Sequence, residues 1–150
     1  MKILVDGDAC PVTVIIEKIS AEYGIKTIFI HSTSHYSPIS NSVVIEKIMV
    51  DNVSQAADMA IINKASEGDI IITGDFGLAS LALGKKAHAI SFSGRIFNES
   101  NIDRLLFERH LSNVVRRGGG RARGPAKRNK EDDLNFEKAL RSLIEKTWKI

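Results

Sequence analysis

The chain has 150 residues, of which 43% are hydrophobic and 26% are charged, with a formal net charge of +3 and a single cysteine. This composition is typical of a globular domain, and it excludes a largely disordered chain, a disulfide-stapled mini-protein and a zinc site built on several cysteines. No apolar run approaches the roughly 18 residues of a membrane span, and an acid follows the first apolar run too early for a signal peptide, so we expect one domain, residues 1–150, in the cytoplasm.

Residues 1–93 alternate between predicted strands and predicted helices. Apolar runs bounded by turn residues indicate the strands, and apolar residues repeated every three or four positions indicate the helices. This alternation with short connections predicts an α/β fold of three layers, in which helices flank a central, mainly parallel sheet. The predicted strands are residues 2–5, 25–30, 42–50, 70–73 and, as the last strand, 87–92, and the predicted helices are residues 12–23, 53–65 and 78–83.

Residues 94–150 form a predicted helical C-terminal part. We expect one helix over residues 101–115 and a final helix that is capped by Asp132 or Asp133. Between them, residues 116–130 hold seven bases and no acid, with four glycines and one proline, which predicts a flexible basic loop between two docked helices. Residues 1–100 hold 8 bases and 11 acids, whereas the remainder holds 13 and 7, so we expect the two parts to have different roles.

Acidic residues follow three of the predicted strands. In a parallel sheet the carboxyl ends of the strands meet at one edge, where ligands bind. Carboxylates gathered there repel one another unless a cation is present, and oxygen ligands suit Mg²⁺ or Mn²⁺. Such an ion can activate water against a phosphodiester. The predicted metal ligands are Asp6 and Asp8 after the first strand, Asp51 after the third, Asp75 after the fourth, and Asp58 in the second helix.

Each acid also has a purely structural interpretation. An Asp that follows a strand commonly makes a turn or caps a helix, and Asp8, just before the first predicted helix, is the clearest case. Asp69 lies at the opposite edge of the predicted sheet and is interpreted as part of a turn. The recurrence of acids after three strands favours a site over coincidence.

Four segments of the chain resemble one family. They are Val5–Pro11, Gly68–Asp75, Ile102–Arg109 and the Gly118-Gly119 segment. Through these motifs nearly the whole chain resembles the YaiI/YqxD family of uncharacterised bacterial proteins, which looks like a branch of the PIN/NYN nuclease superfamily. PIN-like domains have one acid after the first strand, one in a middle helix and one at a Thr/Ser-x-Asp strand end. The resemblance therefore implies a PIN-like domain with a ribonuclease-like site that depends on Mg²⁺ or Mn²⁺, and the matching positions are Asp6, Asp58 and Asp75.

The chain departs from the PIN pattern in two places. PIN nucleases often have a further acid shortly after the position of Asp75, whereas residues 76–79 contain none. This departure implies fewer metal ligands, and one ion rather than two. The arginine-rich segment 116–130 is not a general feature of that superfamily.

The basic segment is the stronger signal for a partner. Arginine side chains bind phosphates in a bidentate manner and glycines let backbone amides approach, so we expect a nucleic acid, with RNA favoured. The segment has no aromatic residue, so it gives no support for sequence-specific reading of single strands. The predicted contacts are Arg95, Arg116, Arg117, Arg121, Arg123, Lys127 and Arg128.

One cysteine and two histidines are weaker candidates. Cys10 precedes Pro11 at a helix start and is interpreted as a small, partly buried residue, with a site-lining or redox role as the alternative. His31 and His35 fall in a predicted polar loop, residues 31–41, at the ligand edge. There they are either substrate contacts or exposed residues without a role.

Three functions remain open on the sequence alone. The first is a divalent-metal-dependent ribonuclease-like phosphodiesterase that uses Asp6, Asp58 and Asp75. The second is a non-catalytic RNA-binding module in which the acids are remnants or hold a structural metal. The third is a haloacid-dehalogenase-type phosphatase with Asp6 as nucleophile, Asp8 as general acid and Lys64 as phosphate clamp, although the chain is short and has no evident cap domain.

Overall fold

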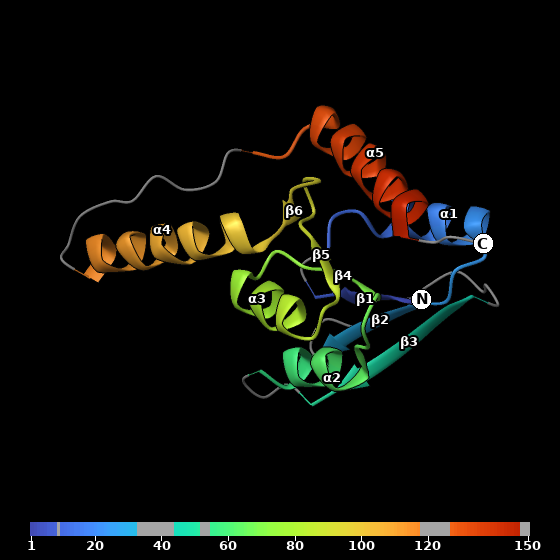
Figure 1. The fold of residues 1–150 in the computed structure, drawn as a ribbon, viewed down its shortest axis with the longest axis horizontal. Coiled ribbons are helices and arrows are strands. Elements are labelled where there is room, and N and C mark those ends of the chain that lie inside the picture. Colours follow the sequence, from blue (N-terminus) through green and yellow to red (C-terminus); the bar gives the residue numbers. More distant parts are fainter. Residues whose placement is uncertain (9, 33–43, 52–54, 118–126, 148–150) are drawn as a thin grey trace.

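The computed structural model of the chain describes residues 1–8, 10–32, 44–51, 55–117 and 127–147. Within these ranges a six-stranded sheet lies at the centre, with the strand order β3-β2-β1-β4-β5-β6 (Figure 1). Strands β1 to β5 pair in parallel, and β6 pairs with β5 in the antiparallel direction. The strands are β1 (Ile3–Asp6), β2 (Thr27–Ser32), β3 (Ile45–Val50), β4 (Ile70–Ile72), β5 (His88–Ile90) and β6 (Ile96–Phe97).

Helices cover both faces of this sheet. The helices α1 (Thr13–Tyr23) and α5 (Lys130–Thr147) cover one face, and α2 (Ala56–Lys64), α3 (Phe76–Gly84) and α4 (Glu99–Arg117) lie on the other (Figure 1). This arrangement confirms the predicted α/β fold, with a mainly parallel sheet between two helical layers. Among the described helices, none is long and apolar enough to cross a membrane.

The strand β1 shows why both faces of the sheet need a helical cover. Ile3 and Val5 pack into the cluster under α1 and α5, whereas Leu4 packs into the cluster under α2 and α3, and all three are fully buried. Successive side chains of a strand point to opposite faces, so a strand that is apolar at every position buries both. Each of these side chains stabilises the fold by about 1.5–3 kcal/mol.

The last helix belongs to the core. Phe136, Leu140 and Ile144 of α5 are fully buried in the same cluster as Val5 and Phe29. The predicted boundary at residue 93 falls inside the sheet, between β5 and β6, because the chain adds one more strand before it leaves the sheet. A strand of two residues is too short to show an alternation of apolar and polar residues, so the sequence does not predict β6.

The prediction that Asp132 or Asp133 caps the final helix is wrong. The helix begins at Lys130, and Asn129 caps it: Asn129 Oδ1 accepts the backbone N–H of Asp132 (3.0 Å), and Asp132 Oδ2 accepts that of Asn129 (2.9 Å). This reciprocal pair is a capping box, in which the acid is the third helical residue rather than the cap. Asp133 instead pairs with Arg128, at 2.8 Å from its Nη2.

The turn between β5 and β6 is held tightly against α5. Gly94 adopts a φ of +92°, and a Cβ at this position would lie 2.7 Å from the backbone oxygen of Asn135. The Ser91 Oγ accepts the backbone N–H of Arg95 (3.0 Å), which closes the turn from inside. Only glycine satisfies both the backbone conformation and the close approach.

Replacement of Gly94 should therefore destabilise the fold. We expect Gly94→Ala to lower the free energy of unfolding by about 2–4 kcal/mol, because the left-handed conformation and the backbone clash add up. The matched control is Gly84→Ala at the end of α3, where a Cβ meets open space. We expect this control to change stability by less than about 1 kcal/mol. Urea unfolding of both variants is the measurement, and equal midpoints would contradict the tight turn.

Candidate functional site

One hydroxyl group joins the carboxyl ends of β1 and β4. Thr73 is fully buried directly after β4, and its Oγ1 donates a hydrogen bond to Asp6 Oδ2 (3.1 Å). The same oxygen accepts the backbone N–H of Asp75 (3.0 Å). A hydroxyl can donate and accept at once, so Thr73 orients the Asp6 carboxylate and the turn that carries Asp75 together.

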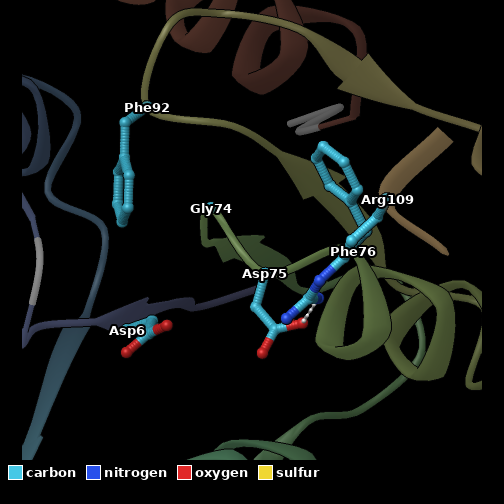
Figure 2. Close-up of a pocket in the computed structure, with 6 residues that line it drawn as sticks. All are labelled: Asp6, Gly74, Asp75, Phe76, Phe92 and Arg109. Carbon is cyan, nitrogen blue, oxygen red and sulfur yellow. Dashed lines mark hydrogen bonds and ion pairs between the residues drawn. The ribbon is translucent and has the colours of Figure 1, made fainter. Parts of the chain in front are cut away.

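Asp75 caps α3 and contacts an arginine from α4. Its Oδ1 accepts the backbone N–H groups of Gly77 (2.8 Å) and Leu78 (3.3 Å), two donors that the helix start leaves without partners. Arg109 Nη1 lies 3.3 Å from the same oxygen. Figure 2 shows the second oxygen of Asp75 turned away from this ion pair, with Asp6 on the neighbouring strand. Among the described residues, none donates a hydrogen bond to that second oxygen.

A third carboxylate comes from Asp58, in the first turn of α2. Burial, followed by the charges of Asp75 and Asp6, raises the pKa of Asp58 to about 6. Burial also raises the pKa of Asp6; the hydrogen bond from Thr73 opposes that rise, and the charges of Asp8 and Asp75 add to it. The structure therefore brings Asp6, Asp58 and Asp75 close enough for their charges to interact.

Two adjoining pockets open beside these acids. The first, of about 500 Å³, is lined by Asp6 and Asp75, and the second, of about 480 Å³, by Asp58 and Asp75. Arg109 lines both, and it is the only base among their described lining residues. No three His, Cys, Asp or Glu side chains in the described part of the chain lie close enough together to enclose a metal ion. The acids thus surround an open hollow rather than form a closed cage.

The other two predicted metal ligands are not among the described residues that line the two acid pockets. Asp8 raises the pKa of Asp6 by its charge, but its own Oδ1 accepts the backbone N–H of Ser32 (2.8 Å) at the end of β2. The interpretation of Asp8 as the cap of α1 is wrong, because Val12 occupies that position without a side-chain cap. Asp51 is exposed after β3, two strands away from β1.

Asp69 has the structural role expected of it. It is 3% exposed at the opposite edge of the sheet, where its carboxylate accepts the backbone N–H groups of Lys2 (3.1 Å) and Ser66 (2.8 Å). The Lys2 ammonium group completes its contacts at 2.6 Å.

The prediction of a loop that starts at His31 is wrong. The strand β2 continues through Ser32 because it pairs with β3 along its whole length, and this pairing carries His31 into the sheet. The imidazole is 3% exposed and stacks on Phe29, with 6.4 Å between the ring centroids. A Cβ at Gly7 would lie 2.6 Å from the ring, so a glycine is required there. The position of His35 lies outside the described residues.

The predicted nucleic-acid contacts divide into three groups. Arg95 and Arg128 line a third pocket next to the acids, and Arg128 is also paired with Asp133. Lys127 is exposed. The backbone of Arg116 and Arg117 ends α4, whereas their side chains, and the whole of Arg121 and Arg123, fall outside the described residues.

Cys10 is half-buried against the core. Burial raises the pKa of its thiol, against smaller lowering effects from hydrogen bonds to Val12 and Thr13. A raised pKa disfavours the thiolate that redox chemistry needs. Cys10 is also not among the residues that line the acid pockets.

Two residues of the hollow were missed from the sequence. Arg109 ends a segment of the family resemblance, but its place on an amphipathic helix does not indicate that it reaches Asp75. The apolar pattern predicts Phe92 as the end of a strand. The segment Ile102–Arg109 within the family resemblance was the one signal that pointed toward Arg109.

Comparison with known proteins places the chain in a family. A family described as "Uncharacterized BCR, YaiI/YqxD family" matches residues 4–146. A UPF0178 protein from Clostridium kluyveri is 47% identical over 96% of this chain and 93% of its own length. Another, from Ruminiclostridium cellulolyticum, is 48% identical over 96% of this chain and 92% of its own length.

One solved structure shows a remote likeness. The crystal structure of Rae1 (YacP) from Bacillus subtilis is 16% identical, with a TM-score of 0.43 over 98% of this chain and 91% of that chain. This likeness is too low to equate residues between the two proteins. The family match covers most of the chain and agrees with relatives of nearly the same length, so the chain belongs to the YaiI/YqxD family.

Proposed function

We propose that the chain is a divalent-metal-dependent, ribonuclease-like phosphodiesterase with Asp6, Asp58 and Asp75 as its catalytic carboxylates. The supporting observation is the convergence of these acids, from β1, α2 and the turn after β4, around two adjoining pockets. There burial and the charges of Asp75 and Asp6 raise the pKa of Asp58, and the charge of Asp75 adds to the rise at Asp6. The sequence resemblance to PIN-like nucleases selects the same three positions. RNA is the proposed partner and the cytoplasm the proposed location.

The arrangement fits a hydrated ion. Mg²⁺ commonly keeps several waters and binds through one or two carboxylates together with phosphate oxygens, so a closed cage is not required. Asp6 and Asp75 each have one carboxylate oxygen without a hydrogen bond from the described residues, and a cation would relieve the repulsion that Asp58 experiences. Asp6 and Asp75, which line the same pocket, would hold the ion directly, and Asp58 would lie beside it. A bound Mg²⁺ or Mn²⁺ supplies the Lewis acidity that favours attack of water on a phosphodiester.

Three side chains have separate roles in this proposal. Asp58, with a pKa of about 6, accepts a proton more readily than an ordinary aspartate and acts as the general base. Thr73 positions Asp6 through its hydrogen bond. Arg109 lines both acid pockets and offers a planar, bidentate donor to a phosphate oxygen.

The phosphatase alternative finds less support. Its proposed general acid, Asp8, accepts the backbone N–H of Ser32. Its proposed phosphate clamp, Lys64, ends α2 and precedes β4, which places it at the amino edge of the sheet, opposite Asp6. The two groups that this chemistry needs beside the nucleophile are therefore engaged elsewhere or distant.

Cleavage of RNA is the direct test of the proposal. We expect the wild-type chain to cleave a labelled single-stranded RNA in Mn²⁺ but not in EDTA. Asp75→Asn should lower the rate by about 100-fold or more, because it removes a carboxylate charge and keeps a side chain that caps α3 equally well. The matched control, Asp51→Asn, changes an exposed acid on the same edge and should stay within about twofold of wild type.

Three other results of this assay would overturn the proposal. Equal cleavage by wild type and Asp75→Asn, purified identically, would place the activity elsewhere or in a contaminant. Loss of activity in Asp51→Asn would mean that the catalytic carboxylates are not the proposed three. Absence of cleavage, with RNA binding that survives Asn at positions 6, 58 and 75 together, would support the non-catalytic binding module.

Replacement of Arg109 should change the affinities for metal and for RNA in opposite directions. Because its guanidinium competes for Asp75, we expect Arg109→Met to tighten Mn²⁺ binding by about threefold and to weaken RNA binding in EDTA by about fivefold. The control is Arg104→Met on the same helix, an exposed residue outside both acid pockets. Electron paramagnetic resonance of free Mn²⁺ and fluorescence anisotropy measure the two affinities. Parallel changes in both would contradict the competition.

The metal-free protein should lose stability as the pH rises. Between the usual pKa of 3.8 and the folded value of about 6, the folded chain binds the Asp58 proton more tightly than the unfolded chain does. The unfolding free energy therefore falls across this window and is lowest above it. In EDTA we expect Asp58→Asn to be more stable than wild type at about pH 7.5 and to lose this advantage at about pH 4. Urea unfolding at both values is the measurement, and a constant difference would contradict the raised pKa.

A further inference from the structure

A third hollow adjoins the acid site and differs from it in chemistry. It has a volume of about 520 Å³, and no acid is among its described lining residues. It shares Gly74, Phe76 and Phe92 with the first acid pocket, so the two lie side by side. We name it the Phe92 subsite, and the other lining residues that matter here are Ser93, Arg95 and Arg128.

Two phenyl rings line both the subsite and the first acid pocket. Figure 2 shows Phe92 and Phe76 on either side of Gly74, with Asp6 and Asp75 beyond them. A Cβ at Gly74 would lie 3.3 Å from the Phe92 ring, so the ring rests against the bare backbone there. Phe76 is fixed from behind by an edge-to-face contact with Phe97, at 5.7 Å between ring centroids. Both flanking rings are only half-buried, which leaves aromatic surface open to a ligand.

Two arginines give the subsite a positive rim. Arg95 is exposed and forms no ion pair with the described residues. Arg128 is oriented by Asp133, with its Nε at 2.9 Å from Oδ1, and its side chain is 27% exposed. Flat hydrophobic faces beside guanidinium groups, of which Arg95 has no ion pair with the described residues, suit a ligand that combines a planar ring with a phosphate.

The turn that carries these groups is rigid. Ser91 Oγ accepts the backbone N–H groups of Ser93 (3.3 Å) and Arg95 (3.0 Å). Gly94 is pressed against the backbone of α5. Phe92 and Arg95 therefore project from a preorganised turn, and a ligand loses little free energy in ordering them.

We propose that the Phe92 subsite binds one unpaired nucleotide of a nucleic-acid strand, with its base stacked on Phe92 and its phosphate at Arg95. The inference rests on the proposed function, since it places the neighbouring phosphodiester over Asp6 and Asp75. Only an unpaired base exposes its face for such stacking, so the subsite selects single strands over duplexes.

The test measures binding without catalysis. A fluorescent 12-nucleotide single-stranded RNA with a central 2-aminopurine is titrated with the full chain in EDTA. Loss of one base–aromatic stack costs about 1–3 kcal/mol, so we expect Phe92→Leu to bind about 5- to 150-fold more weakly and to lose the 2-aminopurine quenching. Phe92→Trp, which keeps an aromatic face, should restore both. The matched control is Phe107→Leu, at a 60%-exposed phenylalanine on α4, which should bind like wild type.

Two further measurements complete the experiment: a salt titration of Arg95→Met and a titration with duplex RNA. Arg95→Met should lower the magnitude of the log–log salt slope by about 0.7, the value for one phosphate contact on a single strand. A duplex of the same sequence should bind wild type and Phe92→Leu equally. Circular dichroism melting of each variant confirms that it is folded.

Several outcomes would overturn the subsite. They are wild-type affinity in a folded Phe92→Leu, no binding of the single strand by wild type, or an equal loss of duplex binding. The result is separable from the proposed function. RNA binding that depends on Phe92, without any RNA cleavage, would support the subsite and contradict the nuclease. RNA cleavage that depends on Asp75, with RNA binding that does not depend on Phe92, would support the nuclease and contradict the subsite.

Discussion

The hydroxyl group of Thr73 connects the two strand ends on which the candidate site depends. It donates to Asp6 at the end of β1 and accepts the N–H of Asp75 after β4, and it is fully buried while doing so. This connection is available because β1 and β4 are parallel neighbours in register, so both chains leave the sheet at the same edge. A hydroxyl that is satisfied in both directions holds its partners in one orientation. The Asp75 carboxylate then begins α3 and turns one oxygen toward the hollow.

The acids of this site oppose the stability of the fold. Burial and the charges of neighbouring acids raise the pKa values of Asp6 and Asp58, which means that the folded chain holds their negative charges less favourably than the unfolded chain does. The two hydrophobic clusters of the core stabilise the fold and offset this unfavourable contribution. Arg109 offsets part of the repulsion at Asp75, but it is more than half exposed and leaves the pockets open. Such strain commonly marks a functional site.

The antiparallel pairing of β6 with β5 creates the turn that places Phe92 and Arg95 near the acid site. Had the chain left the sheet after β5, Phe92 and Arg95 would not lie on a tight turn beside the acids. The return through β6 requires Gly94, which allows the turn to rest on the backbone of α5. The helix that completes the core thus also fixes the neighbourhood of the acid site. The acids of the first pocket and the arginines of the neighbouring Phe92 subsite therefore come from segments that are far apart in the sequence.

The sequence by itself determined the parallel α/β sheet and the edge on which its acids gather. Both follow from local patterns: apolar runs, helical periodicity and turn residues after strands. The choice of Asp6, Asp58 and Asp75 among those acids came from the resemblance to PIN-like domains. Local patterns predicted a loop at His31 and a helix cap at Asp132 or Asp133, and both predictions are wrong. Strand pairing with β3 and the reciprocal hydrogen bonds between Asn129 and Asp132 decide those positions. The partners of Asp75 and the place of Phe92 were likewise decided only in three dimensions. The reason is that Arg109 and Asp75 are 34 residues apart, and their contact depends on how α4 packs on α3, which no periodicity along the chain records.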